Sequence, residues 1–183
     1  MRDDTNVEEE IRNIYQLHYK DVYRFFVSFT KTQDEAEDLT QEVFIRSFKS
    51  FSSFKRKSHV KTWLFSIARN VAIDYSRKAK TKLIFNEVLL KMIPSKQKST
   101  EDVIEIKEQV GDVFNKVKSL KNEYRMVILL RAMNDFSIKE TADIMGWSES
   151  KVKVSYHRAL KQLKTHLETD ETESNGRWLI ENE

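Results

Sequence analysis

Cysteine is absent from this chain of 183 residues, which excludes a disulfide framework and a zinc site with thiolate ligands. The sequence also lacks an apolar run of the roughly 18 residues that a membrane-spanning helix needs. Met1 leads into acidic residues rather than into the apolar segment of a secretory signal. These absences predict a cytoplasmic protein.

Glycine and proline are scarce, with three glycines and one proline in the whole chain. Because both residues are used in turns and hairpins, their scarcity favours helices over sheets. Charged residues make up 33% of the sequence, which suits amphipathic helices packed in small bundles. We therefore expect an all-α protein with two small helical domains at 5–82 and 109–167, a flexible linker at 83–108 and an acidic tail at 168–183.

Apolar residues of the first domain recur at helical spacing in separate segments. One helix is predicted from about Val7 to Ser28, and another from Val60 to Lys80. Between them, Thr32 and Glu35 form a capping-box pattern, which starts a helix that ends near Phe51. The core residues expected in this middle helix are Ala36, Leu39, Val43, Phe44 and Phe48.

Several segments interrupt the helical pattern. The serines and cations of 52–58 favour a loop. The polar segment 94–100 holds the only proline and marks the domain boundary. Before it, the apolar residues of 83–92 fit either a short separate helix or an extension of the preceding helix. The acidic composition of 168–183 favours a disordered tail, and within it Trp178-Leu-Ile180 is either a sticky patch or, as we favour, a flexible end.

The second domain contains a helix-turn-helix pattern. Ser137 and Glu140 form a second capping box, which opens a short helix. Gly146 can take the positive φ that ends this helix, and Ser148 caps a longer basic helix from Glu149 to about His166. Such a unit is typical of DNA-binding proteins, although many unrelated proteins contain one.

Opposite charges are concentrated in separate parts of the chain. Basic residues dominate from Lys55 to Lys82 and again from Lys151 to Lys164, whereas Asp34 to Glu42 is strongly acidic. Taken singly, each basic patch is better explained as a solvated helix face. Two patches that each coincide with a motif suggest that the chain contacts one polyanion at two places.

The longer basic helix carries residues suited to reading DNA in the major groove. Arginine and lysine can bond guanine or phosphate, and an apolar side chain can meet a thymine methyl group. His157 is either such a contact or a solvated surface histidine. Near one face of the helix lie Lys151, Val154, Ser155 and Arg158, with Lys153 and His157 beside them, and the expected core residues are Val152, Ala159 and Leu160.

The other basic segment interleaves aromatic and cationic side chains. This mixture suits single-stranded DNA, because unstacked bases need aromatic surfaces and the backbone needs cations. The amide of Asn70 can hydrogen-bond the Watson–Crick edge of a flipped base. On composition alone, however, Trp63 and Phe65 fit a protein core better than a base platform. The segment's residues are Phe54, Trp63, Phe65, Asn70 and Tyr75, interleaved with Lys55, Arg56, Lys57, Lys61 and Arg69.

Three segments together resemble the extracytoplasmic-function (ECF) sigma factors. Asp34–Phe48 looks like the polymerase-binding part of region 2, and Lys61–Tyr75 like the promoter-melting and −10 element. Phe136–Lys153, followed by His157–Ala159, resembles the region 4 helix-turn-helix. They occur in the family's order over most of residues 10–166, with no sizeable domain between them, as in this minimal branch.

This resemblance implies an alternative sigma factor, which binds core RNA polymerase, recognises −35 and −10 promoter elements and aids DNA melting in an envelope-stress response. It implies three partners: the coiled coil of the largest polymerase subunit, promoter DNA and a membrane-anchored anti-sigma factor. It implies no cofactor, metal ion or small-molecule substrate. The run from Ser148 to Lys153 is most similar to a sigma-X-like branch of Gram-positive bacteria.

The resemblance also assigns roles to residues. Polymerase contacts would be Asp38, Gln41 and Glu42, with Phe44 either beside them or in the core. Single-stranded −10 DNA would meet Phe54, Lys55, Arg56, Lys61, Trp63, Arg69 and Asn70, and Phe54 and Asn70 would line a pocket for a flipped base. The −35 element would meet Ser150, Lys151, Lys153, Val154, Ser155, His157 and Arg158. Ser150-Lys151 and Val154-Ser155 depart from the family's common Gly-Thr and Ser-Arg.

Other functions fit the sequence less well. It has no glycine-rich phosphate loop, no Gly-x-Ser-x-Gly and no His-Glu-x-x-His, so we do not expect an enzyme. The main alternative is a stand-alone helix-turn-helix regulator, whose N-terminal bundle senses a ligand or dimerises. A third is an adaptor or inhibitor that binds polymerase. The regulator would bind duplex DNA tightly by itself and would have no affinity for polymerase.

Overall fold

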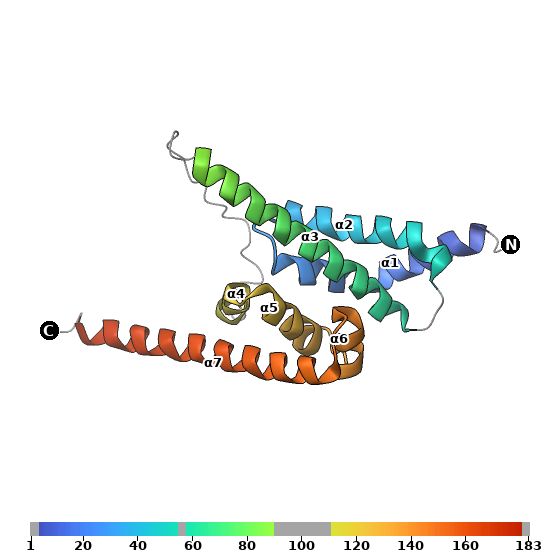
Figure 1. Cartoon of the computed structure of the whole chain (residues 1–183). Coiled ribbons are helices and arrows are strands. Elements are labelled where there is room, and N and C mark those ends of the chain that lie inside the picture. The colour runs from blue at the N-terminus through green and yellow to red at the C-terminus, as the bar shows by residue number, and fades with distance from the viewer. Residues whose placement is uncertain (1–3, 55–57, 90–110, 181–183) are drawn as a thin grey trace. The chain divides into compact units, whose positions relative to one another are not determined.

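The computed structural model describes the backbone of residues 4–54, 58–89 and 111–180 and the side chains of 9–54, 58–79 and 115–166. Within these ranges the chain is helical and has no strand, which confirms the all-α prediction (Figure 1). The α-helices are α1 (Asp4–Val27), α2 (Gln33–Ser50), α3 (Val60–Leu89), α4 (Gly111–Ser119), α5 (Asn122–Ile128), α6 (Ile138–Met145) and α7 (Glu149–Ile180).

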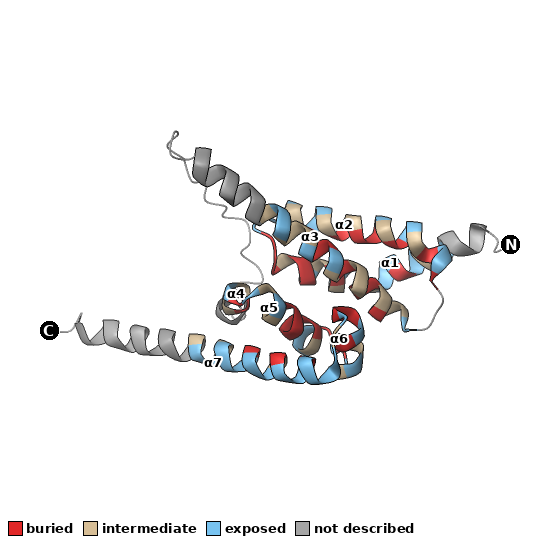
Figure 2. Ribbon diagram, viewed as in Figure 1, coloured by how far each residue is buried: buried red, intermediate tan, exposed pale blue. Residues whose placement is uncertain are grey.

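The chain forms two compact units, and α1, α2 and α3 pack together in the first. Their buried faces appear red in Figure 2. The ring of Phe25 in α1 meets that of Phe65 in α3 edge-on, with 5.7 Å between ring centroids. The side chains fully buried in this core include Val22, Phe25, Phe26, Val43, Leu64 and Phe65. Phe65 is therefore a core residue, as the composition of its segment favoured.

A capping box starts α2 as the sequence predicts. Thr32 Oγ1 accepts a hydrogen bond from the N–H of Glu35 at 3.2 Å, and Glu35 Oε2 accepts one from the N–H of Lys31 at 2.9 Å. Glu35 thus also reaches the residue before the N-cap, whereas in the standard box the donor is the N–H of the N-cap itself. Both contacts satisfy backbone donors that the helix itself cannot pair.

Phe48 is not in the core, so the prediction for this residue is wrong. Its side chain is 54% exposed, whereas Ser47 is buried. Ser47 continues the stripe of Ala36, Thr40 and Val43, and its hydroxyl is satisfied by the carbonyl of Phe44 at 2.8 Å. Phe48 lies one position, or about 100°, further around the helix. Ser47, whose hydroxyl is paired within its own helix, thus occupies the core position that hydrophobicity alone would assign to Phe48.

Two helices are longer than the sequence predicts. Helix α3 continues to Leu89, so residues 83–89 extend this helix rather than form a separate one. The structure does not describe Leu90, Met92 or the boundary segment 94–100. Helix α7 continues to Ile180, so the expectation of a disordered tail from residue 168 is wrong up to that point. Adding a residue to an existing helix needs no new nucleation, and no proline follows Glu149 to stop it.

The second unit packs α5 and α4 against α7. Helix α5 runs into a π-helical turn, Leu129–Met133, after which Asn134 Nδ2 donates to the carbonyl of Leu129 at 2.9 Å. The chain then turns at Asp135, whose φ of 57° lies in the left-handed region. The Arg131 guanidinium donates to the carbonyl of Phe136, which ties this turn together.

Local signals place the helix-turn-helix correctly. Ser137 and Glu140 make a reciprocal capping box at the start of α6, with bonds of 3.1 and 2.8 Å. Gly146 has the predicted positive φ, 62°, at the end of that helix. Ser148 Oγ accepts from the N–H of Lys151 at 3.2 Å and so caps α7. Across the described residues, no helix combines the length and apolar character needed to cross a membrane.

Candidate nucleic-acid and partner interfaces

The outer face of α2 carries the residues predicted to bind a protein partner. Asp38 and Gln41 are exposed there. The same stripe continues, at spacings of three and four residues, with Ile45 and Phe48, which are 48% and 54% exposed. Sequence reasoning missed both as surface residues, although their spacing from Asp38 was a usable signal. We call Asp38, Gln41, Ile45 and Phe48 the α2 stripe.

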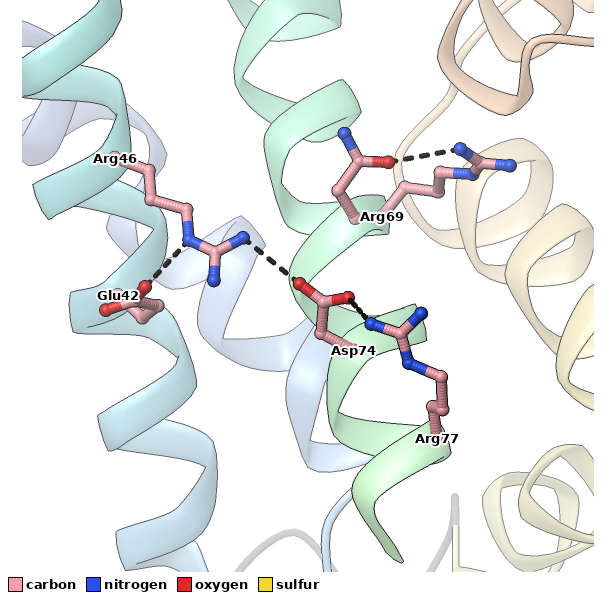
Figure 3. Close-up of polar contacts among 6 residues, drawn as sticks. Glu42, Arg46, Arg69, Asp74 and Arg77 are labelled. Atoms are coloured by element: carbon pink, nitrogen blue, oxygen red, sulfur yellow. Dashed lines mark hydrogen bonds and ion pairs between the residues drawn. The ribbon is translucent and has the colours of Figure 1, made fainter. Parts of the chain in front are cut away.

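Glu42, also predicted to meet that partner, is engaged within the chain. Its Oε1 accepts from Arg46 Nε at 2.7 Å, and Arg46 Nη1 reaches Asp74 Oδ2 in α3 at 3.3 Å (Figure 3). Asp74 Oδ1 is also bonded by Arg77 Nη2, at 3.0 Å. The hydrogen bond to Glu42 raises the pKa of Arg46 against the opposing effect of burial, and the bond to Asp74 adds to it. This chain of charges connects α2 with α3.

Phe44 belongs to the core, which decides between the two positions considered for it. Its side chain is 7% exposed. Its ring lies against Tyr15 of α1, with centroids 4.8 Å apart, and near Tyr19 at 6.4 Å. Phe44 therefore holds α2 on α1, and the α2 stripe lies next to that contact on the exposed side of the helix.

The aromatic residues predicted to stack on bases are stacked on one another. Phe54 is only 8% exposed, and its ring lies 4.6 Å from that of Trp63 at an interplanar angle of 23°. Phe51 meets the same indole edge-on at 5.9 Å. Phe54 is thus not an open platform, and Trp63, which is half-buried, has one ring face covered by Phe54. Lys55 and Arg56 lie outside the described residues.

Lys61, at the start of α3, is held by α1. Its Nζ lies 3.4 Å from Asp21 Oδ2. Beside this pair, the Nδ1 atom of His18 is buried and has no hydrogen-bond partner among the described residues. Burial lowers the pKa of His18, and the charge of Lys61 lowers it further, against a smaller opposing effect of Asp21. A neutral His18 is therefore favoured next to the lysine.

Asn70 and Arg69 remain suited to nucleic acid. Asn70 is exposed on α3, and its Oδ1 accepts from Arg69 Nη1 at 3.1 Å (Figure 3). The contact engages the amide oxygen, so the amide nitrogen is the group that could donate to a base.

In α7 most of the predicted DNA contacts are exposed, and one is not. Ser155 is 8% exposed and lies on the packed side with Val152 and Ala159. Its predicted place on the outer face is therefore wrong. Leu160, expected in the core, is 42% exposed, because it lies one position beyond Ala159. The predicted contacts that are exposed are Ser150, Lys151, Lys153, Val154, His157 and Arg158.

The exposed face of α7 has its centre at Ser150, Val154 and His157, which follow one another at helical spacing. Lys161 continues the series and was missed as a site residue. Val154, 49% exposed, is an apolar position within this basic face. The side chains of Val154, His157 and the neighbouring Arg158 can meet base edges and methyl groups in a major groove.

Comparison with known proteins agrees with this arrangement. The sequence matches the Sigma-70 region 2 family over residues 14–82 and the Sigma-70, region 4 family over residues 114–163. It is 36% identical over 168 residues to the ECF RNA polymerase sigma factor SigX of Bacillus subtilis (strain 168). The aligned residues cover 88% of this chain and 86% of SigX. The chain belongs to the ECF sigma factors. It is thus an alternative sigma factor, a regulatory initiation factor of transcription.

Other relatives of this ECF sigma factor extend the similarity. SigM of the same organism is 37% identical over 155 residues, which cover 84% of this chain and 93% of SigM. The sigma factor RpoE from Bartonella quintana, solved with the anti-sigma factor NepR, has the same fold, with a TM-score of 0.72 at 23% identity over 88% of this chain and 99% of that one. CnrH, solved with the cytosolic domain of CnrY, gives 0.65 at 21% identity over 89% and 90%.

A metal centre finds no support in the described part of this sigma factor. No group of three or more histidine, aspartate or glutamate side chains there could hold a metal ion. Among its acidic residues, Glu35 caps a helix and Asp74 bridges two helices.

Proposed function

We propose that this ECF sigma factor binds core polymerase through the α2 stripe, holds melted −10 DNA against α3 and reads the −35 element with α7. The first two roles fall in the domain at 5–82 and the third in the domain at 109–167, with 83–108 as the linker. The observation that carries the proposal is the exposure of Asp38, Asn70 and Arg158, one residue for each role, within the matched regions.

Polymerase binding is supported by the chemistry of the α2 stripe. Asp38 and Gln41 offer charge and hydrogen bonds, and Phe48 offers an exposed aromatic ring. Protein interfaces derive most of their affinity from a few such anchors, which fill pockets on the partner. We assign the partner surface to the coiled coil of the largest polymerase subunit, with cations opposite Asp38 and an apolar pocket opposite Phe48. Glu42 contributes through Arg46 as well as directly.

Capture of the −10 element is assigned to polar and cationic residues of α3. Asn70, whose amide oxygen accepts from Arg69, would hydrogen-bond a flipped base of the non-template strand. Lys61 would exchange Asp21 for a phosphate, since both are anions and phosphate can approach from solvent. The rings of Phe54 and Trp63 are stacked on one another beside this surface, and Lys55 and Arg56 complete the proposed contacts.

Recognition of the −35 element is assigned to the exposed face of α7. Arg158 can bond a guanine in two places, and Val154 can contact a thymine methyl group. Ser150, His157 and the lysines Lys151 and Lys153 add contacts to bases or phosphates. Ser155 acts indirectly, because its buried side chain helps to pack this helix on the unit.

An anti-sigma factor is a further proposed partner. Two solved relatives support it, since RpoE was solved with the anti-sigma factor NepR and CnrH with the cytosolic domain of CnrY. A membrane-anchored protein of this kind would hold the present factor inactive until envelope stress releases it.

The test is transcription in vitro with purified bacterial core polymerase, a genomic template and the full chain, followed by sequencing of the RNA start points. Discrete new starts that share two upstream elements are the expected result, and they would give the promoter sequence. A chain with Asp38→Asn and Gln41→Ala is the matched control, since both residues are exposed and their loss should reduce starts without unfolding the protein.

Two results would oppose the proposal. If folded protein and competent core gave no new starts, the chain would not act as an initiation factor under these conditions. If the chain alone bound duplex DNA tightly and had no affinity for core polymerase, the stand-alone regulator would be the better description.

A further inference from the structure

Trp147 occupies the turn of the helix-turn-helix and has no role in the functions proposed above. Trp147 follows Gly146, whose φ of 62° redirects the chain. The backbone N–H of Trp147 donates to the carbonyl of Ala142 at 3.0 Å. The indole is half-buried, so part of the ring remains at the surface. Since Trp147 stands just before α7, its ring lies beside the first turn of the proposed recognition helix.

A cation lies over the Trp147 ring. The Nζ atom of Lys151 lies 3.9 Å from the centroid of the Trp147 ring, well within the range of a cation–π contact. The backbone of Lys151 is also fixed, because its N–H donates to Ser148 Oγ at 3.2 Å. Lysine side chains are normally free to take many rotamers. Here the ring and the cap restrict Lys151 at both ends.

Lys151 lies to one side of the centre of the exposed face of α7, on the same flank as Arg158 two turns later. Ser150, Val154 and His157 form the centre of the face, and Lys151 lies about 100° away from Ser150 around the helix. Side chains on a helix lean toward its N-terminus, and the indole attracts the ammonium in the same direction. Lys151 is thus directed toward the turn rather than across the centre of the face.

The start of a helix is a favourable place for an anion and an unfavourable one for an isolated cation, because of the unpaired N–H groups and the helix dipole. An ammonium held there becomes favourable when a phosphate approaches. The ring fixes the charge without neutralising it, as a carboxylate would. The pair therefore has the properties of a phosphate contact rather than of a base contact.

We propose that Trp147 is a positioning residue, which holds the Lys151 ammonium for a phosphate of the −35 DNA backbone. Base reading is then left to Val154, His157 and Arg158. This inference rests on the proposed binding of the −35 element by α7 and adds to it a division between residues that orient the helix and residues that read sequence.

A double-mutant cycle tests the inference with holoenzyme assembled from the full chain and core polymerase. The probe is a duplex that carries the −35 element and ends upstream of the −10 element, and affinity is measured by fluorescence anisotropy at several salt concentrations. Lys151→Gln should weaken binding by a similar factor for every −35 sequence. It should also reduce the slope of log affinity against log salt by about 0.9, the value for one phosphate contact.

Trp147→Leu should lower the affinity about two- to five-fold, the range expected for an exposed cation–π contact. In the Lys151→Gln background the same change should have almost no effect, because the ring then has no cation to hold. Trp147→Phe should keep most of the affinity, since it retains an aromatic face. Lys153→Gln is the matched control, and in that background Trp147→Leu should keep its full effect.

Several outcomes would overturn the inference. Additive effects of Trp147→Leu and Lys151→Gln would show that the ring does not act through the lysine. An effect of Lys151→Gln confined to one base pair would make Lys151 a base-reading residue. If Arg158→Ala and Lys151→Gln both left the affinity unchanged, α7 would not bind DNA and the proposed function itself would fail.

Discussion

The hydroxyl of Tyr75 in α3 donates a hydrogen bond to Oε2 of Glu35, at 3.0 Å, in the first turn of α2. The same oxygen accepts the N–H of Lys31. Burial, and then the bond to Glu35 and its charge, raise the pKa of Tyr75 to about 12. The capping of α2, the helix that carries the proposed polymerase surface, therefore depends on α3, the helix that carries the proposed −10 surface.

Tyr75→Phe removes this bond and should lower the free energy of unfolding by about 0.5–1.5 kcal/mol. Because the pKa of Tyr75 is higher in the folded state than its ordinary value of 10.0, the contribution is complete below that value and is lost as pH rises through about 12. Denaturant unfolding over this range should show the loss in the parent chain and a flatter profile in the variant. Tyr15→Phe, at an exposed ring, is the control, and an equal flattening there would contradict the assignment.

Phe48→Ser should weaken binding to core polymerase by more than about 1 kcal/mol, as expected for an interface anchor. Stability should change by no more than about 0.5 kcal/mol, because the ring is already exposed in the free protein. Surface plasmon resonance with immobilised core measures the first quantity and thermal unfolding the second. Leu17→Ser, on α1 and outside the α2 stripe, should leave core affinity unchanged. Equal losses in both variants would show a non-specific effect.

Arg46→Gln breaks the connection from Glu42 to Asp74. The side chains are 36–42% exposed, so a double-mutant cycle with Asp74→Asn should give a coupling energy below about 1 kcal/mol. Since Glu42 loses the group that orients it, affinity for core polymerase should fall in the variant, with little further loss on adding Glu42→Gln. Fully additive effects of these two changes on core affinity would show that Arg46 does not act through Glu42.

Asn70→Ala should impair opening of the promoter while leaving core binding intact, because the amide is proposed to touch DNA alone. Permanganate reactivity of unpaired thymines measures opening, and co-sedimentation with core measures binding. Ser66→Ala is a control on the same helix, since that hydroxyl bonds its own backbone at the carbonyl of Thr62. A loss of core binding in Asn70→Ala would make the residue structural.

Arg158→Ala should weaken −35 recognition by about 1–3 kcal/mol if the guanidinium bonds a base. The affinity of holoenzyme for −35 duplexes with single base-pair changes shows whether discrimination is lost at one position. Gln162→Ala, at an exposed neighbour one turn further along α7, should leave the preference intact. An unchanged preference in Arg158→Ala would remove this residue from the recognition set.

Features that depend on neighbouring residues were predictable. Both capping boxes, the positive φ of Gly146 and the Ser148 cap follow from side chains that bond backbone groups a few positions away. The helix-turn-helix follows from the same local rules. For that reason the elements and their order could be read from the chain.

Contacts between distant segments could not be predicted in this way. Whether Ser47 or Phe48 faces the core depends on where α1 and α3 press against α2, and a difference of one position reverses the outcome. Phe54 is an aromatic residue in a basic segment, as a base platform would be, but Trp63 of the following helix covers its ring. Ser155 and Leu160 exchange their expected places for the same reason.

The sequence by itself thus determined the helices, their caps, the family and the chain order of its regions, because these depend on short-range bonds and on motifs of adjacent residues. The tertiary structure alone decided which side chains of each helix remain for partners and which are held by other helices. Burial and ion pairing are properties of surfaces brought together from distant parts of the chain, as Tyr75 and Glu35 are, and no local pattern records them.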